Sequence, residues 1–162
     1  MAEQELPVVE RNRCNCAALR KASRHMTLFY DAALEPSGLR STQYALLTEI
    51  HRRGNAPPSI GDLAEALVID QSTIGQNLRP LERDGLVTLE RAEADRRIRL
   101  VKLTRAGRSR LADARPLWLA AQEKFEDGFG KRAAAELRNV LAGIAGDQSL
   151  IPERHELRSE KA

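Results

Sequence analysis

The spacing of apolar side chains predicts a chain built mainly from amphipathic helices. From about residue 10 to residue 34, apolar positions recur roughly every 3.6 residues, which is typical of one helix face. A second helix is expected over residues 41–53, with Ser41 as its N-cap and Gly54 at its end. Its buried face is predicted to carry Tyr44, Leu47 and Ile50.

Two short helices with a tight connection follow. Residues 59–67 begin with Ser59 and Asp62 in the spacing of a capping box, and they carry a short apolar stripe. Residues 71–84 form the second predicted helix, which Gly85 ends. Two short helices joined in this way are typical of a helix-turn-helix.

An antiparallel hairpin is predicted next, because residues 86–91 and 97–103 both alternate between apolar and polar side chains. Thr104 is expected to cap a long helix, which Pro116 should bend or split. Gly128 and Gly130 predict a turn before a last helix, and a polar tail follows from residue 147. The apolar stripe of that last helix is Leu137, Val140, Leu141 and Ile144. The predicted fold class is mainly α, a winged helix-turn-helix with helical arms at both ends.

Charge is unevenly distributed along the chain. The whole sequence carries a net charge of +3, but residues 71–110 hold ten basic and five acidic side chains. That segment is therefore at +5 and the remainder at −2. A basic segment on a near-neutral body favours a nucleic-acid partner, although arginines also solvate ordinary helix faces.

The helix over residues 71–84 is predicted to present a polar face. If Ile74, Leu78 and Leu81 are buried, a rotation of 100° per residue places hydroxyl, amide and guanidinium groups on the other side. These groups belong to Ser72, Gln76, Arg79 and Arg83, with Thr73 and Asn77 on the flanks. Such side chains suit base edges and phosphates in the major groove of DNA. The alternative is an ordinary solvated face.

The tip of the hairpin is the second candidate for DNA contact. Arg97 is the residue expected to enter the minor groove, where arginine is favoured by the negative potential. Asp95 and Arg96 are expected to shape the loop and its phosphate contacts.

The sequence Asp95-Arg96-Arg97, followed by Leu103-Thr104 and Gly107 and preceded by Gly85-Leu86-Val87, resembles the signature of MarR-type winged helix regulators. The resemblance covers roughly residues 15–145. It implies a homodimer held together by the terminal helices, which would bind a pseudo-palindromic operator. It also implies a repressor that an oxidant or a small ligand releases from DNA. The domains expected on this basis are a dimerisation helix (1–38), the DNA-binding domain (39–104), C-terminal dimerisation helices (105–146) and a flexible tail (147–162).

The segment over residues 15–27 resembles the first helix of the organic-hydroperoxide-sensing branch of that family. The resemblance puts Cys16 at the reactive-cysteine position and Tyr30 at the position of a tyrosine that contacts the thiolate across the dimer. Other aromatic positions of the branch are Ser41 and Arg20 here, and no later cysteine follows. Cys16 could equally be a small buried hydrophobe. Cys14 points away from it on a helix, which argues against a disulfide or a zinc site within one chain.

A small apolar or aromatic acid is the alternative inducer. Phe29, Tyr44 and Trp118 are the aromatic candidates for its pocket, and Arg20 or His25 could hold a carboxylate. The same residues would also suit an ordinary core or dimer interface.

No enzyme motif, cofactor motif or metal-ligand spacing is recognisable, so catalysis is not expected. The absence of a long apolar run and of a signal-peptide pattern predicts a cytoplasmic protein with no membrane partner. The function expected is that of a dimeric transcriptional regulator. The alternative of another class is a winged helix that binds proteins and not DNA.

Overall fold

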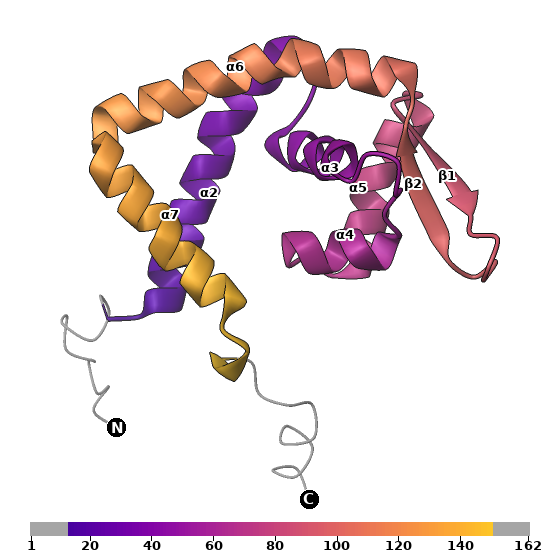
Figure 1. The fold of residues 1–162 in the computed structure, drawn as a ribbon. Coiled ribbons are helices and arrows are strands. Elements are labelled where there is room, and N and C mark those ends of the chain that lie inside the picture. The colour runs from indigo at the N-terminus through magenta and orange to yellow at the C-terminus, as the bar shows by residue number, and fades with distance from the viewer. Residues whose placement is uncertain (1–12, 151–162) are drawn as a thin grey trace, which may run out of the picture. The chain divides into compact units, whose positions relative to one another are not determined.

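The computed structural model describes residues 13–150, and the chain divides into two compact units after Ala121. The first unit holds the helix-turn-helix and the hairpin, and the second holds the end of α6 and all of α7 (Figure 1). Among the described residues, no helix is both long enough and apolar enough to cross a membrane. The three boundaries between the four domains expected from the sequence remain a prediction.

The first described helix, α2, covers Asn15–Leu34 and so begins later than the sequence predicted. Residues 10–12 of the predicted helix lie outside the described part. The Cys14 Sγ caps α2 by accepting a hydrogen bond from the Ala17 N–H at 3.4 Å. A 3₁₀ turn, η1 (Glu35–Ser37), follows, and Gly38 ends it with a φ of 71°. The helix therefore stops where the sequence predicted.

Helix α3 covers Ser41–Arg52, and its N-cap is Arg40, so the prediction of Ser41 as the cap is wrong. The Ser41 hydroxyl and N–H donate instead to Asp31 Oδ1 of α2, at 2.6 and 2.7 Å. At the start of α3, the Gln43 side chain accepts a hydrogen bond from the Arg40 N–H at 2.9 Å. Ser41 thus joins α2 to α3, because a long-range carboxylate takes its hydrogen bonds.

Helices α4 (Ile60–Leu67) and α5 (Gln71–Arg83) form the predicted helix-turn-helix. The capping box is present: the Asp62 N–H donates to Ser59 Oγ at 3.0 Å and the Ser59 N–H donates to Asp62 Oδ2 at 2.8 Å. Val68 makes the turn in the left-handed region, with a φ of 52°. Asp70 caps α5. Both caps fix where the short helices start, so the angle of α5 is set locally as well as by packing.

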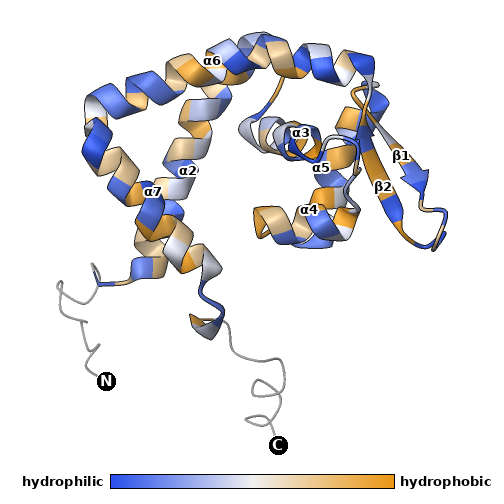
Figure 2. Cartoon of the chain, in the orientation of Figure 1, coloured by the Kyte–Doolittle hydropathy of each residue, from blue (hydrophilic) through white to orange (hydrophobic). Residues whose placement is uncertain are grey.

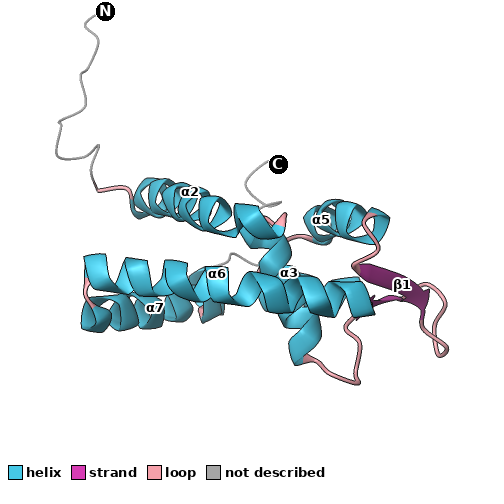
Figure 3. Ribbon diagram, turned by 90° about the horizontal axis from the view of Figure 1, so that it is seen from above, coloured by secondary structure: helices cyan, strands magenta, loops and turns pink. Residues whose placement is uncertain are grey.

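Strands β1 (Val87–Arg91) and β2 (Arg99–Leu103) form an antiparallel hairpin, as predicted, with Val87 opposite Leu103. The Val101 N–H donates to the Pro58 carbonyl at 2.8 Å, which attaches β2 to the segment that leads into α4. The loop that joins the strands extends away from the helices at the edge of the first unit (Figures 1 and 3).

Helix α6 covers Arg105–Phe129, and Thr104 caps it by accepting from the Gly107 N–H at 3.0 Å. The helix is not split at Pro116, contrary to one of the two expectations. Proline removes one backbone bond, and the carbonyl it frees belongs to the exposed residue Ala112, where water can serve it. Gly130, with a φ of 92°, separates α6 from α7 (Lys131–Gly146), and η2 (Gln148–Leu150) follows.

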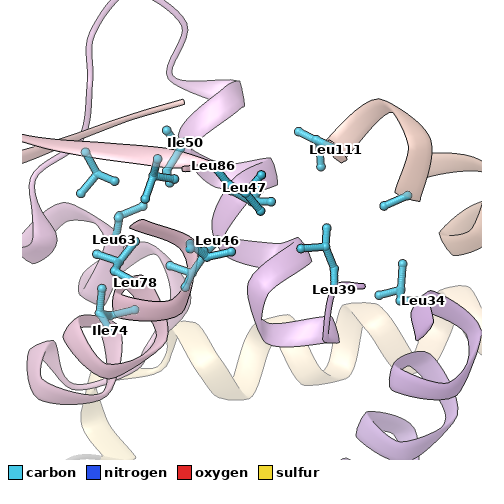
Figure 4. Packing of buried hydrophobic residues seen from close by; sticks show 14 of the residues in the cluster. Leu34, Leu39, Leu46, Leu47, Ile50, Leu63, Ile74, Leu78, Leu86 and Leu111 are labelled. Carbon is cyan, nitrogen blue, oxygen red and sulfur yellow. The ribbon is translucent and has the colours of Figure 1, made fainter. Parts of the chain in front are cut away.

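The core of the first unit lies between α3, α4, α5 and the hairpin, and it continues to Leu34 at the end of α2 and Leu111 of α6 (Figure 4). The predicted face of α5 is confirmed, because Ile74, Leu78 and Leu81 are at most 1% exposed. Each such side chain contributes about 1.5–3 kcal/mol by leaving water. Helix α5 is therefore held firmly by one face, and its opposite face is available to a partner.

Candidate nucleic-acid interface

The outer face of α5 carries the side chains that the helical spacing predicted. Ser72, Gln76, Arg79 and Arg83 are exposed, and Thr73 and Asn77 on the flanks are partly buried. Their role in contacting DNA remains a prediction, but their placement on one accessible surface agrees with it.

Two hydroxyls of this face are engaged by the N-cap. The Asp70 carboxylate accepts from the Ser72 hydroxyl, from the Thr73 N–H at 2.8 Å and from the Thr73 hydroxyl at 2.7 Å. Hydrogen bonds from Ser72 and then Thr73 lower the pKa of Asp70 to about 2, so the carboxylate is ionised at neutral pH. The sequence had not singled out Asp70, although an aspartate directly before a helix is a recognisable cap.

The remaining side chains of the face differ in how freely they can reach a ligand. Asn77 Nδ2 donates back to the Thr73 carbonyl at 3.0 Å, and Arg83 pairs with Asp84 at 3.0 Å. Gln76 and Arg79 make no side-chain hydrogen bond with the described residues. These two are therefore the best placed to contact a partner without first breaking an internal bond.

The loop of the hairpin is organised by Asp95. Its Oδ1 accepts from the Arg97 N–H at 2.9 Å, and the Asp95 carbonyl accepts from the Ile98 N–H at 2.9 Å. The Arg97 guanidinium touches the same carboxylate at 3.3 Å, yet its side chain is 93% exposed. Arg97 thus projects from the loop and is not packed inward against an acidic residue.

Two hollows flank the hairpin. One, of about 540 Å³, lies between the starts of α4 and α5 and the hairpin. The other, of about 680 Å³, lies on the hairpin itself and has four arginines in its lining. Residues that line the first include Ser59, Gly61, Gln71, Ser72, Arg97 and Arg99, and the second is lined by Leu89, Arg91, Arg96, Arg97 and Arg99. Helix N-termini and guanidinium groups both favour anions such as phosphates.

Arg91 and Arg99 are site candidates that the sequence analysis missed. They lie directly opposite each other across the ladder, where two like charges destabilise a hairpin unless an anion offsets them. The signal was present in the sequence as two arginines at equivalent places of paired strands. It could be recognised only with the register of the hairpin, which the sequence did not define.

The sensing candidates on α2 lie apart from this surface. Cys14 and Cys16 are both exposed free thiols, so in the described chain Cys16 is not the buried hydrophobe that was one alternative. Tyr30 comes 14 residues after Cys16, which corresponds to about 21 Å along a helix. Within one chain its hydroxyl cannot reach the thiol, and its ring contacts Phe29 at 5.2 Å. No cluster of possible metal ligands occurs among residues 13–150.

A cavity of about 390 Å³ lies between α2, α3 and α6 within the first unit, with Leu67 at the end of α4 also in its lining. Tyr44 and Trp118 stack there, with ring centroids 5.9 Å apart and an angle of 21°. Burial raises the pKa of Tyr44. Of the five predicted pocket residues, only these two line it, and the structure does not bring Arg20, His25 or Phe29 there. The additional lining residues are Tyr30, Leu34, Ser41, Ala45, Thr48, Glu49 and Leu67.

Glu49 is the acidic residue in the lining of that cavity. Hydrogen bonds from Arg52, and also from Arg53, lower the pKa of Glu49 to about 2. The two N···O distances are 2.7 and 2.9 Å. The carboxylate of Glu49 therefore has its hydrogen-bond partners outside the cavity. The stacked rings of Tyr44 and Trp118 form the main surface of the cavity.

An exposed polar helix beside an arginine-bearing hairpin defines a winged helix-turn-helix of the DNA-binding kind. Comparisons with known proteins agree. A profile of the MarR family matches residues 37–98. The chain is 36% identical over 124 residues to the transcriptional repressor NicR of Pseudomonas putida. The matched region covers 76% of this chain and 75% of NicR.

Two further likenesses point the same way. The chain is 39% identical over 101 residues to the transcriptional activatory protein BadR of Rhodopseudomonas palustris, covering 61% of this chain but only 54% of BadR. The crystal structure of the M. tuberculosis transcriptional regulator MosR in complex with DNA superposes with a TM-score of 0.74 at 32% identity, covering 82% of this chain and 94% of MosR. The chain belongs to the MarR family of transcriptional regulators, which are not enzymes.

Proposed function

We propose that this regulator binds a pseudo-palindromic DNA operator as a homodimer and represses transcription from it. Helix α5 would enter the major groove, with Gln76 and Arg79 at base edges, and Arg97 of each hairpin would enter the flanking minor groove. The observation that carries the proposal is the joint placement of a polar α5 face, the arginine hollows and the exposed Arg97 on the first unit. The DNA complex of MosR supports the choice of DNA as the partner.

The apolar surface of the arms supports the homodimer. Hydrophobic side chains on α2, α6 and α7 are 37–61% exposed in the single chain, although stripes at helical spacing normally leave water. The group comprises Leu19, Leu28, Leu119, Phe129, Val140, Leu141 and Ile144. Figure 2 shows that hydrophobic positions, drawn in orange, recur along α2, α6 and α7. A second copy with the same stripes would cover them. Sedimentation equilibrium tests this, because a mass of one chain at micromolar concentration would contradict it.

DNA binding is tested by selecting sequences from a randomised duplex pool and measuring affinity over a range of salt. Selective retention whose affinity falls steeply with salt is the expected result, since arginines displace counterions from phosphates. Arg97→Ala should weaken binding to all sequences, whereas Gln76→Ala should change the preference at particular base pairs. Retention that is neither selective nor salt-sensitive would favour a protein-binding winged helix instead.

Release by a small molecule is the first form of regulation that we propose. The stacked Tyr44 and Trp118 surface suits a flat aromatic compound, and the carboxylate clamp expected from Arg20 and His25 is not assembled around the cavity. Because Trp118 is the only tryptophan, quenching of its fluorescence reports binding directly. Unchanged operator affinity at a compound concentration that saturates the quenching would refute release by this route.

Release by an oxidant is the second, favoured by two free thiols at the start of α2. Cys16→Ser should abolish the loss of operator affinity that mild organic hydroperoxide causes in the unmodified protein. Cys14→Ser is the matched control, because serine preserves the cap of α2. Equal affinity before and after oxidation of Cys16 would rule this trigger out.

A further inference from the structure

The N-cap of α5 does more than begin the helix, because it holds two side chains of the surface proposed to face DNA. One carboxylate receives the hydroxyls of Ser72 and Thr73 and the Thr73 N–H. The inference drawn from this arrangement rests on the proposed DNA binding and concerns which bases the helix can read.

Counting protons shows what each hydroxyl has left to offer. A hydroxyl has one proton and two lone pairs, and an ionised carboxylate can only accept. The Asp70 side chain is ionised at neutral pH, since its pKa is lowered to about 2. The Ser72 and Thr73 hydroxyls must therefore both direct their protons toward Asp70. Only lone pairs remain on the outward side of each oxygen.

An outward lone pair discriminates among the groups that DNA presents. Phosphate oxygens carry no proton, so these hydroxyls cannot bond them. In the major groove the donors are the amino groups of adenine (N6) and cytosine (N4), whereas guanine offers N7 and O6 and thymine offers O4 as acceptors. An acceptor-only hydroxyl thus favours an amino base over a keto base on the strand that it faces.

We propose that Asp70 is a specificity-determining residue: by orienting the Ser72 and Thr73 hydroxyls, it makes them read amino bases and prevents them from contacting phosphates. The neighbouring arginines suit the other role, which is contact with phosphates. Ser72 shares the 540 Å³ hollow with Arg97 and Arg99, whose guanidinium groups supply the donors that phosphates require. Asp70 acts through its neighbours and is a positioning residue.

Asp70→Asn separates this role from helix capping, because asparagine caps helices as well as aspartate does. Its amide oxygen can replace Oδ1 and keep the bonds from the Ser72 hydroxyl and the Thr73 N–H. Its NH₂ group then takes the place of Oδ2 and donates to Thr73 Oγ1. The Thr73 proton is displaced outward, which converts that hydroxyl from an acceptor to a donor.

The experiment selects binding sites from randomised duplex DNA with the full chain and each variant, and then measures affinities for every base at each selected position. The wild-type protein should prefer adenine or cytosine opposite Thr73. Where adenine is the selected base, replacing it by purine, which lacks the amino group, should weaken binding about 5-fold, as expected for the loss of one hydrogen bond. Asp70→Asn should lose or reverse the preference at that position and bind purine and adenine equally.

Two controls isolate the mechanism. Thr73→Val keeps the shape but removes the hydroxyl, so the double variant Asp70→Asn/Thr73→Val should have the same preference as Thr73→Val alone. Glu82→Gln removes one negative charge from the exposed surface of α5 away from the cap. It should shift all affinities together and leave the preference unchanged, which separates an effect of charge from one of hydrogen-bond direction. Circular dichroism melting confirms that each variant is folded.

The outcomes are distinct. A wild-type protein that selects no sequence refutes the proposed DNA binding, and this inference with it. Selective binding in which Asp70→Asn keeps the wild-type preference opposite Thr73, or in which purine replaces adenine there without loss, overturns the inference alone. If ethylation of a phosphate weakens binding of the wild-type protein but not of Thr73→Val, Thr73 contacts that phosphate. That result would also overturn the inference.

Discussion

Replacing Gly107 with alanine should destabilise the first unit severely. Gly107 is buried in the first turn of α6, and a Cβ built there would lie 2.0 Å from the Leu86 carbonyl oxygen and 3.0 Å from its carbon. Real Cβ atoms essentially never approach closer than 3.0 Å. The start of α6 would therefore have to move by about 1 Å away from the Leu86 carbonyl, and overpacking of this kind forces backbone shifts.

That movement would break a compact set of bonds at Thr104. Its hydroxyl donates to the Gly85 carbonyl at 2.7 Å and accepts from the Gly107 N–H at 3.0 Å. Its N–H donates to the Leu86 carbonyl at 3.1 Å. Overpacking costs about 1–3 kcal/mol, and loss of the cap and a hydrogen bond adds about 1 kcal/mol each. The expected loss is thus about 3–5 kcal/mol, a large share of the roughly 5–15 kcal/mol that stabilises an ordinary protein.

The assay is thermal and urea unfolding at one fixed protomer concentration, because association changes the apparent stability of a dimer. At about 2–4 °C per kcal/mol, Gly107→Ala should lower Tm by about 6–20 °C. Gly128→Ala is the matched control in the same helix, since nothing lies within 4 Å of its added Cβ. It should raise stability by up to about 1 kcal/mol. A Gly107→Ala protein as stable as the wild type would refute the reasoning.

Three further changes test other parts of the molecule. Gly75→Ala should stabilise α5 by about 1 kcal/mol, because the added Cβ meets nothing within 4 Å in the chain. The same change should weaken DNA binding if the DNA backbone approaches α5 at this residue. Unchanged affinity in filter binding would contradict such an approach. Val68→Gly should stabilise by about 0.5–1 kcal/mol in urea unfolding, since a β-branched residue at a φ of 52° is strained. Glu49→Gln should reduce the loss of stability that occurs between about pH 4.5 and 2. A carboxyl whose pKa is lowered by folding contributes stability above its pKa in the unfolded chain, and this stability is lost as the pH falls. An unaltered pH profile would exclude a role for the ion pairs with Arg52 and Arg53.

Features set by neighbours along the chain were predictable from the sequence. The buried and polar faces of α5 follow from its 3.6-residue period, and the Ser59 capping box follows from local spacing. Features that depend on distant residues were not. Ser41 does not cap α3, because its hydroxyl donates to Asp31, ten positions earlier. The lining of the aromatic cavity combines residues from α2, α3, α4 and α6. Periodicity assigns a residue to a face but does not say which other element that face meets.

Three departures from local rules lie in the helix-turn-helix and the hairpin, and they support a partner there independently of any likeness to other proteins. Arg91 lies opposite Arg99, Val68 occupies the left-handed region beside α5, and Gly75 interrupts that helix with no neighbour in contact. Each choice lowers the stability of the free chain. Sequences retain such choices where a partner repays them. Opposed arginines and a helix that leaves room for close approach are both accounted for if the partner is a polyanion with a groove, as duplex DNA is.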